Sequence, residues 1–174
     1  MTNFLKKLIG YFDQENISYM LSGSVAMSIY SLPRFTRDFD FIVHLQPKDA
    51  DGIIQYFKEG YYCNPDAVNE AIINKSMFNI IDYESNYKAD FIILKDEPYR
   101  HTEFQRRKEV NFLDMKISLV SPEDLIVSKI AWIQVLQSDM QKEDIKILLQ
   151  MKNIDLGYIH KWVAALKLNT FKLL

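Results

Sequence analysis

The segment that most constrains the fold is Arg37-Asp-Phe-Asp-Phe-Ile-Val43, where acidic and aromatic residues alternate before an apolar run. β-Branched and aromatic residues favour a β-strand. Successive side chains of a strand point to opposite faces, which places Asp38 and Asp40 side by side and sends Phe39 and Phe41 into the core. The simplest alternative is a solvated strand edge. Adjacent carboxylates repel unless a cation lies between them or one is protonated, and hard oxygen ligands suit Mg²⁺. The segment therefore predicts a metal site on a central strand.

A glycine–serine pair, Gly23-Ser24, lies upstream, between a strand expected at residues 17–21 and a helix expected at 25–30. Glycine lets a phosphate approach the backbone, and a helix N-terminus offers free N–H groups to an anion. The plainer alternative is that Gly23 makes the turn and Ser24 caps the helix. The pair is thus a candidate phosphate site.

A third acid, Asp90, opens the apolar run at residues 88–94. If this strand is a neighbour of the strand at residues 39–45, Asp90 completes a three-carboxylate cluster with Asp38 and Asp40. Otherwise Asp90 faces solvent at the start of its strand.

The remaining pattern predicts an α/β portion over residues 1–120 and a helical portion over 121–174, joined without a linker as one continuous body. Further helices are expected at residues 3–15, 48–59, 98–107, 122–137, 139–151 and 155–167. Further strands are expected at residues 77–83, 110–112 and 116–120, with a loop at Pro33 and no defined element over 60–75.

Composition excludes several classes of protein. The chain has 174 residues, of which 48% are hydrophobic and 25% charged, as in ordinary soluble domains. Its formal charge of −2 is unlike that of a strongly basic nucleic-acid coat. Neither a signal peptide nor an apolar run of about 18 residues is found, so we expect a cytoplasmic protein without membrane contact. Cys63 is the single cysteine, which excludes an intrachain disulfide.

Together, Gly23-Ser24, the Asp38-Phe-Asp40 motif thirteen residues later and Asp90 resemble the DNA-polymerase-β-like nucleotidyltransferase superfamily over residues 17–95. The resemblance implies an α+β fold, with a mixed sheet flanked by helices. It also implies transfer of a nucleoside monophosphate from an NTP such as ATP to an acceptor hydroxyl. Two Mg²⁺ ions would lie on the three acids, with Asp90 supporting the ion on the nucleophile side. Gly23, Ser24 and Arg37 would hold the triphosphate.

The run Pro33-Arg-Phe-Thr-Arg-Asp38 further resembles a small bacterial group related to abortive-infection nucleotidyltransferase toxins. The segments 123–130 and 143–148 look like the paired helices of that group. This resemblance implies that Lys129 faces the nucleotide, that Asp144 supports the site, and that an antitoxin is a partner. The plain alternative is a solvated lysine and an acid that begins a helix. The chain departs from the group before Asp144, where relatives often carry an arginine.

Two functions follow as hypotheses. The first is an enzyme that uses an NTP and an acceptor hydroxyl on RNA (such as a tRNA 3′ end), a protein or a small molecule. The second is a catalytically inactive nucleotidyltransferase fold that serves as a nucleotide-binding or regulatory module. The three acids favour the enzyme.

Two other groups of residues have simpler explanations. Trp132 and Trp162 are expected in the core. A basic group is expected to be a solvated helix face, with RNA or phosphate contact as the alternative. This group consists of Arg100, Arg106, Arg107 and Lys108.

Overall fold

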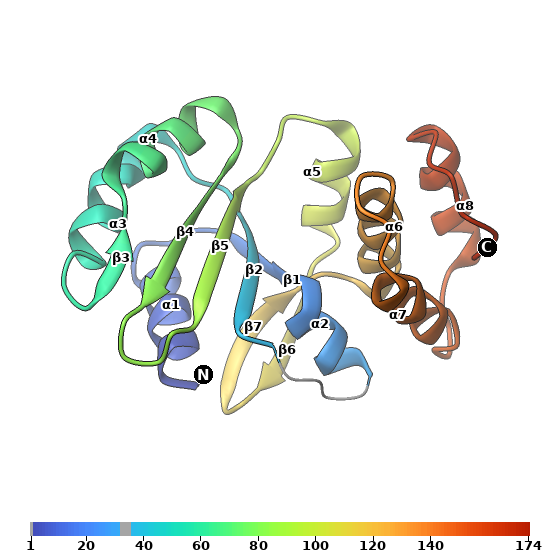
Figure 1. The fold of residues 1–174 in the computed structure, drawn as a ribbon, viewed down its shortest axis with the longest axis horizontal. Helices are drawn as coiled ribbons and strands as arrows, with labels where there is room; N and C mark the ends of the chain where they lie inside the picture. Colours follow the sequence, from blue (N-terminus) through green and yellow to red (C-terminus); the bar gives the residue numbers. More distant parts are fainter. Residues whose placement is uncertain (1, 32–35) are drawn as a thin grey trace.

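A computed structural model describes residues 2–31 and 36–174 and shows a seven-stranded mixed sheet flanked by helices (Figure 1). The order of strands across the sheet is β3-β4-β5-β2-β1-β7-β6. The strands are β1 (Tyr19–Ser22), β2 (Asp38–Val43), β3 (Tyr61–Cys63), β4 (Met77–Asp82), β5 (Lys88–Ile93), β6 (Lys108–Phe112) and β7 (Met115–Leu119). This architecture confirms the predicted α+β fold class.

Eight α-helices are found in the described part of the chain. They are α1 (Thr2–Gln14), α2 (Gly23–Tyr30), α3 (Ala50–Tyr56), α4 (Pro65–Asn74), α5 (Pro98–Gln105), α6 (Pro122–Ile133), α7 (Asp139–Leu149) and α8 (Leu156–Ala165). A 3₁₀ turn at Pro47–Asp49 precedes α3, so the helix expected over 48–59 is divided and shorter. The prediction of no element over 60–75 is wrong, because β3 and α4 form there. The loop expected at Pro33 lies outside the described residues.

The central strands bring the predicted acids together. β2 pairs with β5 in parallel, and Asp40 is the partner of Asp90 in the register. On its other side β2 pairs with β1 in antiparallel orientation, which sets Ser22 opposite Asp40. The expectation that the strands of Asp38 and Asp90 are neighbours is therefore confirmed.

The face of the sheet opposite the acids is covered by aromatic residues. Phe39 and Phe41 of β2 are buried, as the alternation predicts. Phe12 of α1 packs edge-on against Phe41 and Phe91, with ring centroids 5.3 and 5.6 Å apart. This apolar layer holds β2 and β5 flat against α1, and it leaves the opposite face of both strands for polar side chains.

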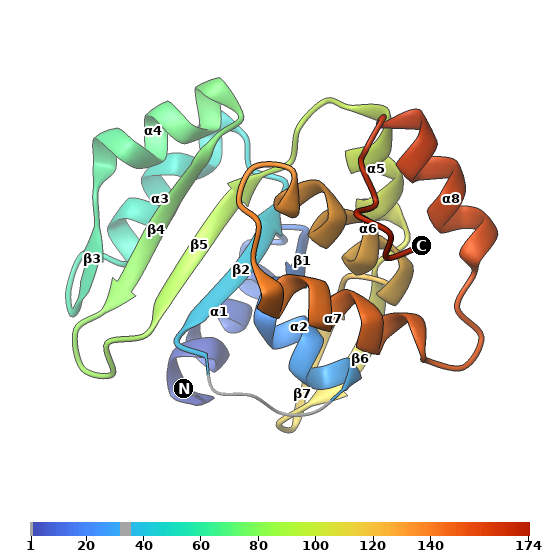
Figure 2. The same ribbon diagram turned by 45° about the vertical axis from the view of Figure 1, so that its right-hand side comes forward.

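The C-terminal helices pack beside the acid-bearing face. α6 contacts α2, α7 and α8, and α7 also contacts α2 (Figure 2). Helix α6 begins at Pro122, where the expected helix also begins, and the Ser121 side chain caps it by accepting a hydrogen bond from the backbone N–H of Asp124. In residues 2–31 and 36–174 no helix is long and apolar enough to cross a membrane.

Candidate active site

A pocket of about 480 Å³ lies between the sheet and the C-terminal helices. Side chains of β2, β5, α5, α6 and α7 line it, together with the junction of β1 and α2. Its volume is in the range of pockets that bind small molecules. Six of the predicted site residues line the pocket: Gly23, Ser24, Asp38, Asp40, Asp90 and Lys129.

The acid cluster consists of Asp38, Asp40 and Asp90. Asp40 and Asp90 are direct neighbours across β2 and β5, and Asp38 precedes them on the same face of β2. The three side chains differ in exposure: Asp90 is buried, Asp40 is half-buried and Asp38 is exposed. The cluster therefore extends from the interior of the pocket to its solvent edge.

Gly23 makes room for the acid cluster. Its φ of +62° lies in the left-handed region, and a Cβ added there would lie 1.8 Å from Asp40 Oδ2. The carboxylate of Asp40 thus lies against the turn between β1 and α2. From the sequence, we expected glycine at position 23 because it lets a phosphate approach the backbone. The structure adds a second reason: a Cβ at this position would collide with Asp40.

The environment of Asp40 disfavours its charged form. Burial raises the pKa of this carboxyl, and the nearby Asp90 carboxylate raises it further. A hydrogen bond from the backbone of Ser24 acts in the opposite direction and lowers the pKa, but the net shift is upward. A cation beside Asp40 and Asp90 would relieve this repulsion.

Lys88 provides one positive charge at the cluster, and the sequence analysis gave it no role. Its Nζ lies 2.9 Å from Asp90 Oδ2 and 3.7 Å from Asp38 Oδ1. The hydrogen bond to Asp90 raises the pKa of Lys88. The signal was present in the sequence, because a lysine two residues before Asp90 on a strand shares its face.

The residues of the acid cluster fit a divalent cation in their chemistry. Asp90 Oδ1 is buried and accepts no hydrogen bond from the described residues, so its lone pairs could serve a cation. The other donors are carboxylate oxygens, which Mg²⁺ prefers. In the part of the chain that the structure describes, no group of three His, Cys, Asp or Glu residues is arranged to hold a metal as the side chains stand. Asp90 Oδ2 instead bonds to Lys88.

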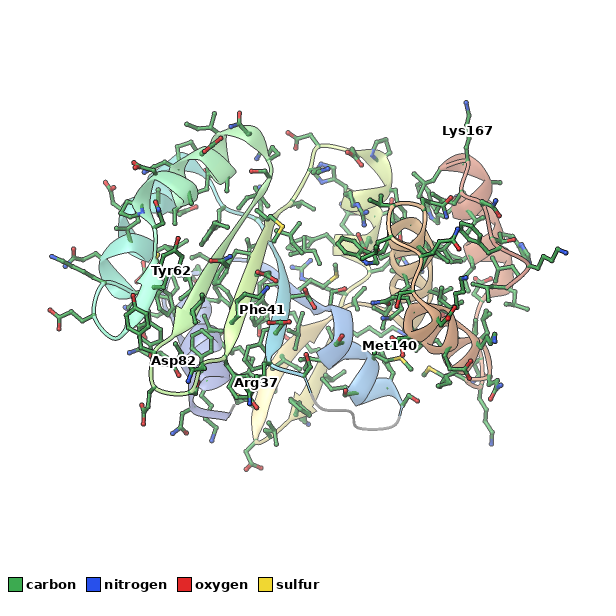
Figure 3. All side chains as sticks on the ribbon, viewed as in Figure 1. Arg37, Phe41, Tyr62, Asp82, Met140 and Lys167 are labelled. Carbon is green, nitrogen blue, oxygen red and sulfur yellow. The ribbon has the colours of Figure 1, made fainter. Side chains whose placement is uncertain are left out.

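The start of α2 faces the same pocket. Ser22 occupies the N-cap position without a side-chain cap, and Gly23 and Ser24 form the first turn of α2. Free N–H groups at such a helix start attract anions. Arg37, by contrast, is exposed at the start of β2 and is not among the residues that line the pocket (Figure 3).

Lys129 lies in the wall of the pocket and is buried there. Its Nζ donates to Asp144 Oδ2 at 2.8 Å and to Gln141 Oε1 at 2.7 Å. Both partners come from α7, so the pair joins α6 to α7 beside the site. The interpretation of Lys129 as a solvated lysine is wrong. Gln141 stands in the segment where relatives of the narrower group often carry an arginine.

Trp132 is not in the core, which corrects the sequence-based expectation. Its side chain is 57% exposed near the end of α6, where it lines the pocket. Helical spacing identifies the face of α6 on which Trp132 lies, but not that the packing partners end before it. Trp162, also expected in the core, is only half-buried and packs against the core, with its ring centroid 5.0 Å from that of Tyr99.

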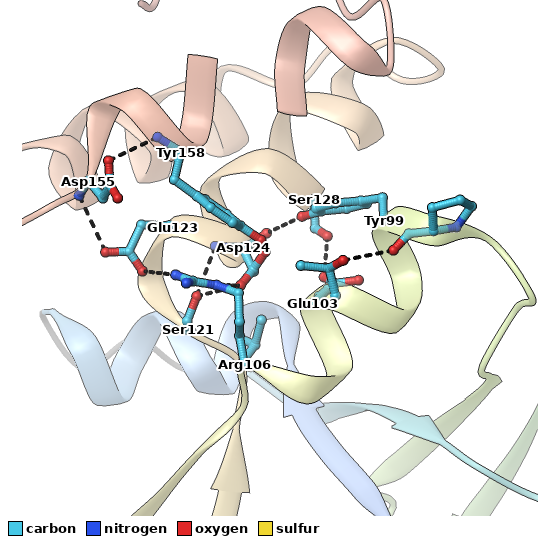
Figure 4. A network of polar contacts seen from close by, with 12 residues as sticks. Tyr99, Glu103, Arg106, Ser121, Glu123, Asp124, Ser128, Asp155 and Tyr158 are labelled. Carbon is cyan, nitrogen blue, oxygen red and sulfur yellow. Dashed lines mark hydrogen bonds and ion pairs between the residues drawn. The ribbon is translucent and has the colours of Figure 1, made fainter. Parts of the chain in front are cut away.

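Two arginines of the basic group do not form a solvated face, because they belong to a network with buried acids. We call this group the helix network; it consists of Arg100, Glu103, Arg106, Ser121, Glu123, Asp124, Ser128 and Tyr158 (Figure 4). Arg106 donates to Asp124 Oδ2 at 3.0 Å and to Glu123 Oε2 at 3.3 Å. Asp124 also accepts from Tyr158 Oη at 2.5 Å. Because both acids pair with its guanidinium, Arg106 has little charge to offer a phosphate.

Glu103 and Arg100 bring the helix network to the wall of the pocket. Glu103 is 1% exposed and accepts from Arg100 at 2.7 Å and from Ser128 Oγ at 2.6 Å. Burial raises the pKa of Glu103, although Arg100 acts to lower it. The sequence analysis gave Glu103 and Ser128 no role, because their contact joins α5 to α6.

No protein-family model matches the sequence, and no curated protein matches it significantly. Solved structures do match the fold. The crystal structure of ANT(2'')-Ia in complex with adenylyl-2''-tobramycin has a TM-score of 0.63 at 12% identity, over 95% of each chain. The solution structure of the antibiotic-resistance factor ANT(2'')-Ia has a TM-score of 0.62 at 11% identity, over 95% of this chain and 90% of that one.

The structure of a second enzyme matches the same fold. The lincomycin-bound lincosamide antibiotic adenylyltransferase LnuA has a TM-score of 0.56 at 18% identity, over 86% of this chain and 97% of that one. At these identities the likeness concerns the fold, and the narrower resemblance to abortive-infection toxins stays a prediction. The mixed sheet and its flanking helices give this chain the fold of the nucleotidyltransferases.

Proposed function

We propose that the protein is a Mg²⁺-dependent nucleotidyltransferase that moves a nucleoside monophosphate from an NTP to an acceptor hydroxyl. The observation that carries this proposal is the buried Oδ1 of Asp90, which lies beside Asp40 and has no hydrogen-bond partner among the described residues. Three clustered acids, next to the start of a helix that can bind phosphate, are what this chemistry requires. The fold supports the same reaction class.

Each site residue has a proposed role. Asp38 and Asp40 hold the metal ions, and Asp90 supports the ion on the acceptor side. When bound, the ions neutralise the phosphates and make the acceptor hydroxyl a better nucleophile. The backbone at Gly23 and Ser24 binds phosphate oxygens at the start of α2.

Two cations have proposed roles on the nucleotide side. Lys129 contributes positive charge from the pocket wall and is held in place by Asp144. Arg37 is exposed immediately before β2 and would approach the triphosphate from the solvent side.

The acceptor is proposed to be a small molecule. Ile42, Ile92 and Met77 form a row across β2, β5 and β4, and all three line the pocket. This apolar row is one step along the strands from Asp40 and Asp90, on the same face. Two of the described cations that line the pocket, Arg100 and Lys129, are paired with acids, which disfavours a polyanionic acceptor. ANT(2'')-Ia and LnuA act on antibiotics, which agrees with a small acceptor. A tRNA end, a protein hydroxyl and an antitoxin partner are the alternatives.

Thermal unfolding tests the site. Mg²⁺ with a non-hydrolysable NTP analogue should raise the melting temperature of the wild type, because the ligands bind only the folded state. Asp40→Asn keeps the shape of the side chain but loses its charge, and should lose most of this rise. Asp96→Asn, at an exposed acid outside the pocket, is the matched control and should keep it.

A transfer assay with α-³²P-labelled NTP distinguishes an enzyme from an inactive nucleotide-binding module. Each of the four nucleotides is tested with panels of RNA, protein and small hydroxyl compounds. An enzyme transfers label and releases pyrophosphate, and Asp90→Asn abolishes both. A nucleotide-binding module without turnover shows the rise in melting temperature but no transfer. If Mg²⁺ with the NTP analogue stabilises Asp40→Asn as much as the wild type, these acids do not bind the metal.

A further inference from the structure

Lys88 has a fixed place in the acid cluster. The parallel register sets Lys88 beside Asp38, and the alternation of β5 puts Lys88 on the same face as Asp90. Its backbone N–H donates to Arg37 O at 2.9 Å, which anchors this end of β5 to β2. The sheet therefore brings the ammonium group to the carboxylates, so this is not a chance contact of a long surface side chain.

The contacts of Lys88 favour the buried acid. Nζ lies 2.9 Å from Asp90 Oδ2, a charge-assisted hydrogen bond, and 3.7 Å from Asp38 Oδ1. The Lys88 side chain is 34% exposed, whereas that of Asp90 is 10% exposed. The Lys88 side chain can therefore rotate toward solvent, whereas the buried Asp90 side chain cannot.

We propose that Lys88 is a resident counter-ion of the acid cluster and competes with a divalent metal ion for Asp90 and Asp38. The inference rests on the proposed function only in that a divalent ion binds at these acids. Mg²⁺ binds carboxylate oxygens at about 2.0–2.1 Å, closer than an ammonium group can come. A metal on Asp90 Oδ2 and an ammonium group on the same oxygen also repel each other strongly. A metal on Asp90 Oδ2 therefore requires Lys88 to leave, and a metal on Oδ1 of the same carboxylate is still repelled by the nearby ammonium group.

Because of this competition, the acid cluster favours a metal ion bound to an NTP over a bare metal ion. Without nucleotide, Lys88 neutralises part of the negative charge, so a bare ion gains less by binding. An ion that arrives with an NTP brings phosphate oxygens as further ligands and additional negative charge, which the displaced ammonium group can neutralise. Lys88 thus couples metal binding to nucleotide binding.

Titration with Mn²⁺ alone, with the free ion counted by electron paramagnetic resonance, tests the proposal. Lys88→Met removes the charge and keeps an apolar stem, and we expect it to bind Mn²⁺ about tenfold more tightly than the wild type. Lys88→Arg keeps the charge and should bind Mn²⁺ about as the wild type does. Lys88→Gln is measured alongside as a second neutral variant, and far-UV circular dichroism confirms folding.

Lys95→Met is the matched control, because Lys95 lines the same pocket just beyond the other end of β5. It removes the same charge without touching the acid cluster, and its Mn²⁺ affinity should stay within about threefold of the wild type. Equal affinities of wild type and both neutral variants, or an equal gain in Lys95→Met, would overturn the competition. If Mg²⁺ with NTP stabilises none of these proteins, the proposed function fails as well.

Discussion

The acid cluster and the helix network both hold buried carboxylates, but they satisfy them differently. In the helix network, Asp124 is fully buried and accepts hydrogen bonds from Arg106, Ser121 and Tyr158. In the acid cluster, Asp90 is also buried, yet one of its oxygens has no hydrogen-bond partner within residues 2–31 and 36–174. Both regions thus bury acids, but only the acid cluster leaves a buried carboxylate oxygen without a hydrogen bond from the described residues.

The difference separates a structural role from a functional one. The helix network joins α5, α6 and α8, and each of its acids has a cationic or hydroxyl partner. A satisfied network of this kind makes a rigid wall. The acid cluster sets three carboxylates against the one ammonium group of Lys88 beside a pocket, and the remaining repulsion costs stability unless a ligand relieves it. Substitutions should therefore have opposite effects on stability in the two regions.

Asp124→Ala should have the largest effect. It leaves the Arg106 guanidinium and the Tyr158 hydroxyl without their shared acceptor, and we expect a loss of about 3–5 kcal/mol in the free energy of unfolding. Urea denaturation measures this value. Glu84→Ala, at an exposed turn, is the control and should change stability by about 0.5 kcal/mol or less. A loss below about 1 kcal/mol in Asp124→Ala would show that the helix network does not stabilise the wall.

Lys129→Met should destabilise the protein by about 3 kcal/mol, because it removes the ammonium partner of the buried Asp144. The double variant Lys129→Met, Asp144→Leu should recover much of this loss, since apolar replacement of both partners is often neutral. Calorimetric titration of the double variant with Mg²⁺ and an NTP analogue then measures the nucleotide role of Lys129 apart from folding. Wild-type affinity in the folded double variant would leave Lys129 with a structural role alone.

Gly23→Ala should lower stability by about 2 kcal/mol and should also abolish stabilisation by Mg²⁺ with NTP, because the new Cβ displaces Asp40. Gly60→Ala is a sharp control. Gly60 also has a positive φ, +83°, but a Cβ there meets nothing within 4 Å. Gly60→Ala should therefore cost about 1 kcal/mol and leave ligand binding intact. Equal behaviour of the two variants in both assays would mean that backbone strain alone acts at Gly23.

Asp40→Asn should have the smallest effect, and of opposite sign: a gain in stability of about 1 kcal/mol or less at neutral pH. The pKa of Asp40 is raised in the folded state, so protonation favours folding and the carboxylate opposes it. In the wild type, the stabilising contribution of protonated Asp40 is present below its unfolded pKa and is lost as the pH rises through the folded pKa. The variant should lack this part of the pH dependence. Melting temperatures at several pH values between about 4 and 8 test the sign.

Local patterns predicted most of the elements and the acid cluster itself. Alternation in β2 placed Asp38 and Asp40 on one face, and this face proved to be the one that meets the pocket. The element missed at residues 65–74 had a signal: Asn64 caps α4 by accepting from two backbone N–H groups, and Pro65 occupies the first helical position. These two residues together predict the start of a helix at residue 65.

Contacts between elements could not be read in the same way. The pair of Lys129 and Asp144 joins two helices, and the network around Asp124 joins three. Neither spacing nor composition shows which charged residues meet across an interface. The exposure of Trp132 is another case, because it depends on where the partners of α6 end. The sequence thus predicted faces well and partners poorly.

The pairing of β1 with β7 has a consequence for synthesis on the ribosome. β1 emerges early, but one of its edges pairs with β7, near the end of the α/β portion, where the Ser118 N–H also donates to Tyr19 Oη. An uncovered strand edge can pair with other chains. This edge stays uncovered until residue 119 has left the ribosome, well after the three acids have emerged. The nascent chain therefore carries its acids before it has a complete sheet, and this interval is when it is most open to misassembly and to chaperones.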